Sequence, residues 1–154
     1  MKSNRILSKL SLGDDSIFSY PHTSTGQSEE IRLRESVAEQ QYADYLLELS
    51  KYHSIPVMDR EVRLFLNSIS KNGSIMDVGG CWGWHWRNIQ DIRPDAKIYI
   101  VDFVRSNLFH AKNVLGDCIG DNVFLVHGDA TNLVFEDNSK RRRIPILPTE
   151  TAST

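Results

Sequence analysis

The stretch that decides the fold is residues 75–83, which read Ile-Met-Asp-Val-Gly-Gly-Cys-Trp-Gly. A short apolar run from Ile75 to Val78 enters a glycine-rich turn, and a segment with helical character follows. A strand, a glycine-rich turn and a helix in this order open a nucleotide-type α/β unit. Glycine adopts unusual backbone dihedrals and lets a ligand approach closely, and the free N–H groups at the start of the next helix face that ligand. We therefore interpret residues 75–83 as a ligand-contacting turn.

Strands and helices alternate downstream of this turn. The expected strands are residues 74–78, 97–102 and 122–127, and the expected helices are about 83–92 and 106–115. The middle strand is almost continuously apolar, as in strands that are covered on both faces. Strands separated by helices imply a parallel sheet with right-handed crossovers. The predicted fold class is therefore α/β, with a parallel sheet of about three strands preceded by N-terminal helices.

The first half of the chain is predicted to be helical after an arm. Ser28 is a candidate cap for a helix to about Tyr52, with Tyr42 facing the core. Pro56 separates this helix from a second one, for which Asp59 is the candidate cap. The predicted organisation is a flexible arm with at most local structure (1–28), N-terminal helices (29–71), the α/β unit (72–139) and a basic, low-complexity tail (140–154).

Composition narrows the function classes. The 154 residues suit one domain, and the net charge of −2 gives no broad attraction to nucleic acid or membrane. No apolar run is long enough for a signal peptide or a bilayer span. Cys81 and Cys118 lack the spacing of a metal site and suit a reducing compartment. We expect a cytoplasmic protein with no metal.

Acidic residues lie at the ends of the three predicted strands. Asp77 begins a D-x-G-x-x-x-G motif, Asp102 ends the second strand, and Gly-Asp-Ala at 128–130 follows the third. The carboxyl ends of parallel strands meet at the edge where open α/β sheets bind ligands. An acid after the second strand can accept both hydroxyls of a ribose, at about 1.5–3 kcal/mol for each charge-assisted bond. The glycines fit no register of the dinucleotide fingerprint G-x-G-x-x-G, which disfavours NAD.

These three motifs together resemble class I S-adenosylmethionine-dependent methyltransferases, especially the branch with many small-molecule and quinone methylases. The resemblance covers about residues 75–139, where VHGDATNLVFEDNS (126–139) resembles the family's third-strand motif. It implies a Rossmann-like methyltransferase fold with S-adenosylmethionine as cofactor. The family's glycine turn cradles the methionine portion, its acid after strand two holds the ribose, and its Asp-Ala pair lies against the adenine. The cofactor-binding residues that the resemblance implies are Asp77, Gly79, Gly80, Gly83, Asp102, Phe103, Asp129 and Ala130.

Two departures from the family's pattern bear on activity. Cys81 stands where the family usually has glycine, and it adds a side chain close to the cofactor. After Ser139 the family continues with a Phe-Asp pair that opens a fourth strand, whereas here Lys140 begins an unrelated tail. Later elements of the family supply most substrate contacts. The chain therefore resembles the cofactor-binding half of the fold, and a truncated or frame-shifted reading frame would give this pattern.

The resemblance implies methyl transfer to a small-molecule acceptor. This in-line displacement depends mostly on positioning and on exclusion of water, and only a weakly acidic acceptor needs a general base. The candidate bases are His85, His110 and His127, and we assign none of them as catalytic. The alternative interpretation is a non-catalytic S-adenosylmethionine-binding remnant or binding module.

Three further features of the sequence concern partners and packing. All three tryptophans lie at positions 82–86, and we expect them to pack between the first helix of the unit and the N-terminal helices. The basic run at 140–143 suggests a weaker hypothesis of nucleic-acid binding, but a solvated terminus is the commoner role. The open flank of the strand at 74–78 invites self-association or pairing with another chain. Residues 144–147 are a candidate edge strand there, limited by Pro145.

Overall fold

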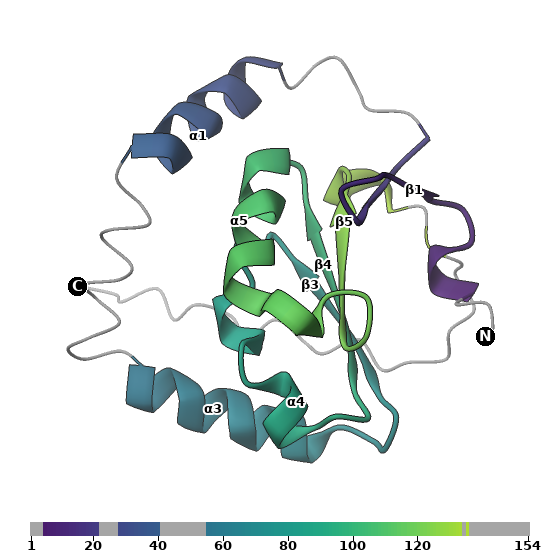
Figure 1. Cartoon of the computed structure of the whole chain (residues 1–154), viewed down its shortest axis with the longest axis vertical. Coiled ribbons are helices and arrows are strands. Elements are labelled where there is room, and N and C mark those ends of the chain that lie inside the picture. The colour runs from purple at the N-terminus through teal and green to yellow at the C-terminus, as the bar shows by residue number, and fades with distance from the viewer. Residues whose placement is uncertain (1–4, 22–27, 41–54, 134, 136–154) are drawn as a thin grey trace, which may run out of the picture.

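The computed structural model of the chain describes residues 5–21, 28–40, 55–133 and 135 (Figure 1). The strands are β1 (Ser11–Leu12), β2 (Ile17–Ser19), β3 (Ser74–Val78), β4 (Lys97–Asp102) and β5 (Val123–His127). The helices are α1 (Ser28–Gln40), α3 (Ile55–Ser68), α4 (Ile89–Ile92) and α5 (Arg105–Leu115). Short 3-10 turns are η1 (Arg5–Leu7), η3 (Trp84–Trp86), η4 (Gly116–Cys118) and η5 (Ala130–Asn132).

The predicted parallel strands are confirmed. β3 pairs with β4 and β4 pairs with β5, both in parallel, so that Ile75, Ile98 and Val123 lie side by side across the sheet. Two of the three strands have the expected bounds, and β5 begins one residue later than expected. The connections contain helices, as parallel neighbours require. The α/β fold class is therefore correct, but the sheet has five strands in the order β1-β2-β5-β4-β3 rather than about three.

The two additional strands come from the N-terminal segment, where a flexible arm was expected. β1 and β2 form an antiparallel hairpin, and β2 pairs in parallel with β5, placing Ile17 opposite Leu125. Ile17 is fully buried. For residues 5–21 the expectation of an arm with at most local structure is therefore wrong. The Ser- and Asp-rich composition of this segment gives no local indication of a strand. The stability of β2 depends instead on its pairing with β5, which is distant in the sequence.

Ionic contacts hold this hairpin against α5. Nη2 of Arg105 donates a hydrogen bond to the Asp15 carboxylate in the hairpin turn at 2.5 Å, and Nη1 of Arg105 donates to the Ser19 hydroxyl at 3.1 Å. The Lys112 ammonium donates to the Asp15 carbonyl at 2.7 Å. The pKa of Asp15 lies below its usual value, because bonds from the Ile17 amide and Arg105 outweigh the opposing effect of burial. The hairpin is thus fixed to both the first and the last turn of α5.

The helices differ from the expectation at their ends. α3 begins at Ile55, so Pro56 lies in its first turn, where the missing proline N–H costs nothing. Asp59 is consequently inside the helix and is not a cap, and both its oxygens accept bonds from Arg87 at 2.6 Å. The expected helix at 83–92 is interrupted and becomes η3 and α4. The first helix is described only to Gln40, so Tyr42 lies outside the described residues.

The helices cover one face of the sheet. In Figure 1 α5 lies along the sheet, with α3 and α4 near its lower end. Leu66 of α3, Ile89 of α4 and Leu108 of α5 are fully buried in a cluster with Ile98 and Leu125 of the strands. Burying such a side chain contributes about 1.5–3 kcal/mol. This layer is therefore the main hydrophobic core of the described residues.

The opposite face is covered unevenly. Tyr99 and Val101 of β4 pack with Leu7 and other N-terminal side chains and are almost fully buried. Their neighbours on β3 are Met76 and Val78, which remain 39% and 50% exposed. Within the part of the chain that the structure describes, β3 has a strand neighbour on one side only. The basic tail and the candidate edge strand at 144–147 lie outside that part.

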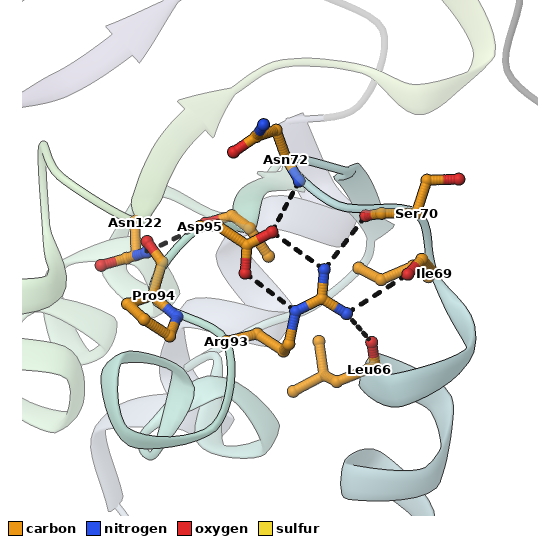
Figure 2. Close-up of polar contacts among 9 residues, drawn as sticks. Leu66, Ile69, Ser70, Asn72, Arg93, Pro94, Asp95 and Asn122 are labelled. Carbon is orange, nitrogen blue, oxygen red and sulfur yellow. Dashed lines mark hydrogen bonds and ion pairs between the residues drawn. The ribbon is translucent and has the colours of Figure 1, made fainter.

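Side chains close the amino ends of the strands (Figure 2). The Arg93 guanidinium donates to the carbonyl oxygens of residues 66, 69 and 70 at 2.5, 3.2 and 3.0 Å, at the end of α3 and just after it. The same group binds both oxygens of Asp95, which accepts the Asn72 amide at 2.6 Å. Nearby, Nδ2 of Asn122 donates to the carbonyls of Pro94 and Ala96 at 2.9 Å. The bonds from Arg93 supply a donor to carbonyls at and just after the end of α3, where backbone acceptors lack intrahelical partners.

No helix in the described ranges is long and apolar enough to cross a bilayer.

Candidate functional site

The glycine-rich turn follows β3 and bends around the end of β4. Gly79, Cys81 and Gly83 have φ values of +73°, +51° and +64°, a region that costs non-glycine residues roughly 1–2 kcal/mol. The Gly79 amide donates to the Val101 carbonyl at 2.8 Å, so the turn begins as a continuation of the sheet. Three left-handed residues within five fold the chain back over the carboxyl ends of the strands. The unusual dihedrals expected from the glycines are therefore present, and Cys81 shares them.

The three glycines serve different purposes. Around a Cβ added at Gly79 no atom lies within 4 Å, so the turn is open to a ligand at this position. A Cβ at Gly80 would overlap the Asp77 carboxylate. A Cβ at Gly83 would lie 2.5 Å from Cδ1 of Ile100. Gly79 therefore faces open space, whereas Gly80 and Gly83 allow the turn to pack closely on the chain beneath it.

Asp77 lies under the turn. Its Oδ2 accepts the indole N–H of Trp86 at 2.7 Å. Trp86 is buried and its ring lies 6.4 Å from that of Phe65 in α3, in line with the expected packing against the N-terminal helices. Trp82 instead contacts α5, where His110 lies 5.6 Å from it, ring centre to ring centre. The bond between Asp77 and Trp86 thus links β3 to η3 across the turn.

Asp102 joins the end of β4 to the turn. Asp102 is only 6% exposed. Its carboxylate accepts the Cys81 amide at 3.1 Å through Oδ2 and the Val104 amide at 2.8 Å through Oδ1. Nδ2 of Asn107 lies 3.5 Å from Oδ1. Burial raises the pKa of Asp102, and these hydrogen bonds, which lower it, offset the effect only in part. Burial and the charge of Asp102 together raise the pKa of the Cys81 thiol to about 11. A thiol with this pKa is a poor nucleophile at neutral pH.

The end of β5 is tied to the end of β4. The Gly128 amide donates to the Asp102 carbonyl at 3.1 Å, and Nε2 of His127 lies 3.1 Å from the Phe103 carbonyl. Asp129 follows, and its Oδ1 accepts both the amide and the hydroxyl of Thr131, at 2.8 and 2.7 Å. The structure therefore brings Asp102, Phe103 and Gly128 together beside the turn.

Asp129 and Ala130 come next along the chain, half-buried and exposed respectively. We use the term strand-end site for the turn at 79–83, Asp102 and Phe103, and residues 128–130. All eight cofactor-binding residues suggested by sequence lie in or directly under this site. The described ranges contain no group of three His, Cys, Asp or Glu side chains that could hold a metal ion.

Two residues at this edge of the sheet escaped sequence reasoning. Tyr20, which follows β2, donates its amide to the His127 carbonyl at 3.2 Å, and a Cβ at Gly128 would lie 2.5 Å from the Tyr20 ring. The Arg34 guanidinium of α1 lies 5.4 Å from the centre of the Phe103 ring. No pattern in the sequence indicates that either residue lies at this edge. The Tyr20 ring explains why position 128 is a glycine, because a Cβ there would overlap it.

Comparisons with known proteins bear on the fold. No protein-family model matches the chain, and no curated protein sequence does. Among solved structures, it is similar to a proposed S-adenosyl-L-methionine-dependent methyltransferase from Methanococcus maripaludis, with 24% identity and a TM-score of 0.50 over 62% of this chain and 44% of that one. A proposed O-methyltransferase from Nostoc punctiforme is 22% identical, with a TM-score of 0.39, over 51% of this chain and 24% of that one.

The chain thus spans less than half the length of the Methanococcus maripaludis protein. The similarity to that protein shows a shared fold, a Rossmann-like α/β fold.

Proposed function

We propose that the chain binds S-adenosylmethionine at the strand-end site and acts in the cytoplasm as a methyltransferase on a small molecule. The observation that supports this best is the placement of Asp102. Its carboxylate lies at the end of the second parallel strand and bonds the turn amide of Cys81. An acid in this position suits the two hydroxyls of a ribose.

The residues present fit such a cofactor. The Asp102 carboxylate accepts two backbone amides and, at 3.5 Å, the side-chain amide of Asn107, whereas a carboxylate offers about four lone-pair sites. Acceptor capacity therefore remains for a ligand hydroxyl. The open space at Gly79 leaves the turn accessible to a ligand. The Cys81 side chain is half-buried next to Asp102, so it is partly withdrawn into the protein.

The chemistry would divide between cofactor and chain. S-adenosylmethionine supplies an activated methyl group when it is bound. In our proposal Gly79 and its neighbours receive the methionine portion, Asp102 holds the ribose, and Phe103 with residues 129–130 borders the adenine. Catalysis by these residues would come from orientation of the methyl group and from exclusion of water.

A second candidate function is binding of the cofactor without turnover. The observation that favours it concerns the three candidate bases within the described residues. His85 is exposed in η3, His110 lies against the Trp82 ring, and His127 is occupied by the Phe103 carbonyl. An acceptor that needs deprotonation would have to obtain a base from elsewhere. A truncated methyltransferase, as the sequence suggested, would behave in this way.

Calorimetry tests the proposal. We expect the purified chain to bind S-adenosylmethionine and S-adenosylhomocysteine, with NAD and ATP as controls that bind at least tenfold more weakly. Absence of heat with both sulfur ligands at millimolar concentration would refute the proposed function. Transfer of a radiolabelled methyl group to a panel of phenols, quinols and carboxylic acids then separates the two candidates. Binding without transfer to any acceptor favours the second.

Self-association through the edge of β3 is a related proposal. Met76 and Val78 are exposed there on one side of the strand, and an unpaired strand edge with apolar side chains can pair with another chain. Light scattering coupled to size-exclusion chromatography should show a concentration-dependent dimer that Val78→Lys abolishes. The control is Leu12→Lys, at the opposite end of the sheet order. A monomer at every concentration would contradict the proposal.

A further inference from the structure

His127 connects the two loops that form the strand-end site. It is the last residue of β5, and its Nε2 lies 3.1 Å from the Phe103 carbonyl beyond the end of β4. A carbonyl oxygen can only accept a hydrogen bond, so Nε2 carries the proton. The Gly128 amide adds a second link to the Asp102 carbonyl. Two hydrogen bonds thus continue the contact between β4 and β5 past the last residues of the strands.

The surroundings of His127 favour a neutral imidazole. The ring is half-buried, and Ser19 of β2 is its partner in the sheet register. Burial lowers the pKa of His127, and the nearby charge of Arg105 acts in the same direction. The bond to Phe103 and the carboxylates of Asp102 and Asp15 oppose this shift without cancelling it. Since the ordinary pKa is 6.5, the imidazole is neutral at pH 7.

Phe103 is the residue through which His127 can act on the site. It stands between Asp102 and Val104, and the Val104 amide is one of the two backbone groups bonded to the Asp102 carboxylate. The Phe103 carbonyl and the Val104 amide belong to one peptide unit, so fixing this carbonyl also fixes the amide that binds the Asp102 carboxylate. With a residue at position 127 that cannot donate a hydrogen bond, this peptide unit loses the bond at its carbonyl and keeps the one at its amide.

We propose that His127 is a positioning residue of the strand-end site, whose Nε2–H fixes the Phe103 carbonyl and thereby orients Asp102 relative to the turn at 128–130. The inference rests on the proposed function for its consequence in binding. It assigns His127 a role other than that of a general base, because the donor nitrogen is occupied by the protein itself. The N-terminal hairpin belongs to the same arrangement, since Ser19 and Asp15 hold Arg105 beside the ring.

The first test needs no ligand. Amide exchange by NMR is measured at Val104 and Gly128 in the wild type, in His127→Leu and in His127→Gln, whose side-chain amide can donate in place of Nε2. Loss of one hydrogen bond should speed exchange in His127→Leu by about tenfold, and His127→Gln should restore most of the protection. Equal exchange in the wild type and His127→Leu would overturn the proposal. Should His127→Leu not fold, a wild-type NMR spectrum with the neutral proton on Nδ1 would overturn it as well, and one with the proton on Nε2 would support it.

The second test measures ligand discrimination. S-adenosylhomocysteine and S-inosylhomocysteine differ only in the purine that would lie near Phe103 and residues 129–130. We expect His127→Leu to weaken binding of the adenosyl ligand by about tenfold and to reduce the ratio between the two ligands, while His127→Gln restores both. His85→Gln is the matched control, because His85 is exposed. Binding by the wild type with an unchanged ratio in His127→Leu overturns the positioning role but leaves the proposed function intact. No binding by the wild type refutes the proposed function instead.

The third test uses pH. Protonation leaves Nε2–H in place, but as pH falls through the lowered pKa of His127 a charge forms in a half-buried place beside Arg105. Repulsion between the two cations should loosen the ring from the Phe103 carbonyl, so affinity for S-adenosylhomocysteine should fall at a midpoint below 6.5. His127→Gln should lack this step. Asp15→Asn removes a carboxylate that favours the charged imidazole and should move the midpoint to lower pH, whereas Asp14→Asn, at an exposed neighbour, should not. A step that persists unchanged in His127→Gln would contradict the proposal.

Discussion

The two ends of the parallel sheet differ in the side chains that bind the backbone there, although Asp95 accepts an amide at the amino ends and His127 donates to a carbonyl at the carboxyl ends. At the amino ends, donors such as Arg93 and Asn122 bind backbone carbonyls. At the carboxyl ends, acceptors such as Asp102 and Asp129 bind backbone amides. The contacts at the amino ends complete the structure, whereas the carboxyl ends keep an open glycine and unused acceptor capacity. Stability and ligand binding are therefore expected to depend on opposite ends of the same strands.

Removal of the Arg93 guanidinium should have the largest effect. Arg93→Ala leaves three carbonyls at the end of α3 without this donor, and we expect the melting temperature to fall by roughly 10 °C. Differential scanning calorimetry measures this change. Below the transition, the affinity for S-adenosylhomocysteine should stay within about twofold of the wild type. Arg63→Ala, at an exposed position of α3, is the control. If Arg93→Ala lost affinity for S-adenosylhomocysteine but kept its stability, the proposed difference between the two ends of the sheet would be contradicted.

Substitution of Asp102 should show the opposite pattern. Asp102→Asn removes charge-assisted acceptance from ligand hydroxyls, so affinity for S-adenosylhomocysteine should fall about 10- to 100-fold. Stability at pH 7 should not fall in proportion, since burial already disfavours the carboxylate. Calorimetric titration and thermal unfolding measure the two quantities. Asp121→Asn, an exposed acid at the amino ends, should change neither, and a loss of affinity there would break the comparison.

A pair of glycines separates the two ends more finely. Gly79 and Gly120 both have positive φ and open space around an added Cβ, so Gly79→Ala and Gly120→Ala should each cost about 1–2 kcal/mol of unfolding free energy. Only Gly79→Ala places a methyl group in the strand-end site and should weaken S-adenosylhomocysteine binding. Urea unfolding and titration calorimetry provide the comparison. Equal affinities in the two variants would show that the turn does not receive the ligand.

The smallest expected effect is the pH dependence contributed by Asp102. Because burial raises its pKa above 3.8, the folded chain holds this proton more tightly than the unfolded chain. The contribution of this carboxyl to stability is therefore present below about pH 4 and is lost as pH rises through its folded-state pKa. Unfolding of the wild type and Asp102→Asn across pH 4–7 should show a difference that grows with pH in favour of Asp102→Asn. A difference that shrinks with pH would mean that the pKa is lowered.

Sequence patterns were sufficient for the central strands and for the convergence of their ends at one edge of the sheet. The apolar runs at 74–78 and 97–102 are nearly continuous, and strand ends in a parallel sheet converge by geometry. The roles within the site required the structure. Gly80 and Gly83 serve packing rather than ligand approach, and Asp77 binds Trp86. These distinctions depend on which atoms lie beneath the turn, and sequence spacing does not contain that information.

The N-terminal hairpin could not be predicted from local pattern. β2 has three residues, and its partner β5 lies more than 100 residues away in the chain. No local pattern identifies Arg93 as a donor to backbone carbonyls, because those carbonyls lie at the end of α3 and just after it, more than 20 residues earlier in the chain. The break between η3 and α4 follows a turn whose left-handed Gly83 redirects the chain before a regular helix can start. Each of these features is set by tertiary contacts.

The parallel pairing of β2 with β5 has a consequence for biosynthesis. Ile17 and Phe18 are synthesised more than 100 residues before Leu125 and Val126, with which they are in register. At about 5–20 residues per second, the nascent hairpin waits on the order of 5–20 s for its neighbour. During that interval its apolar side chains are accessible to chaperones and to other nascent chains. Pairing of β2 with the sheet must therefore wait for the synthesis of β5.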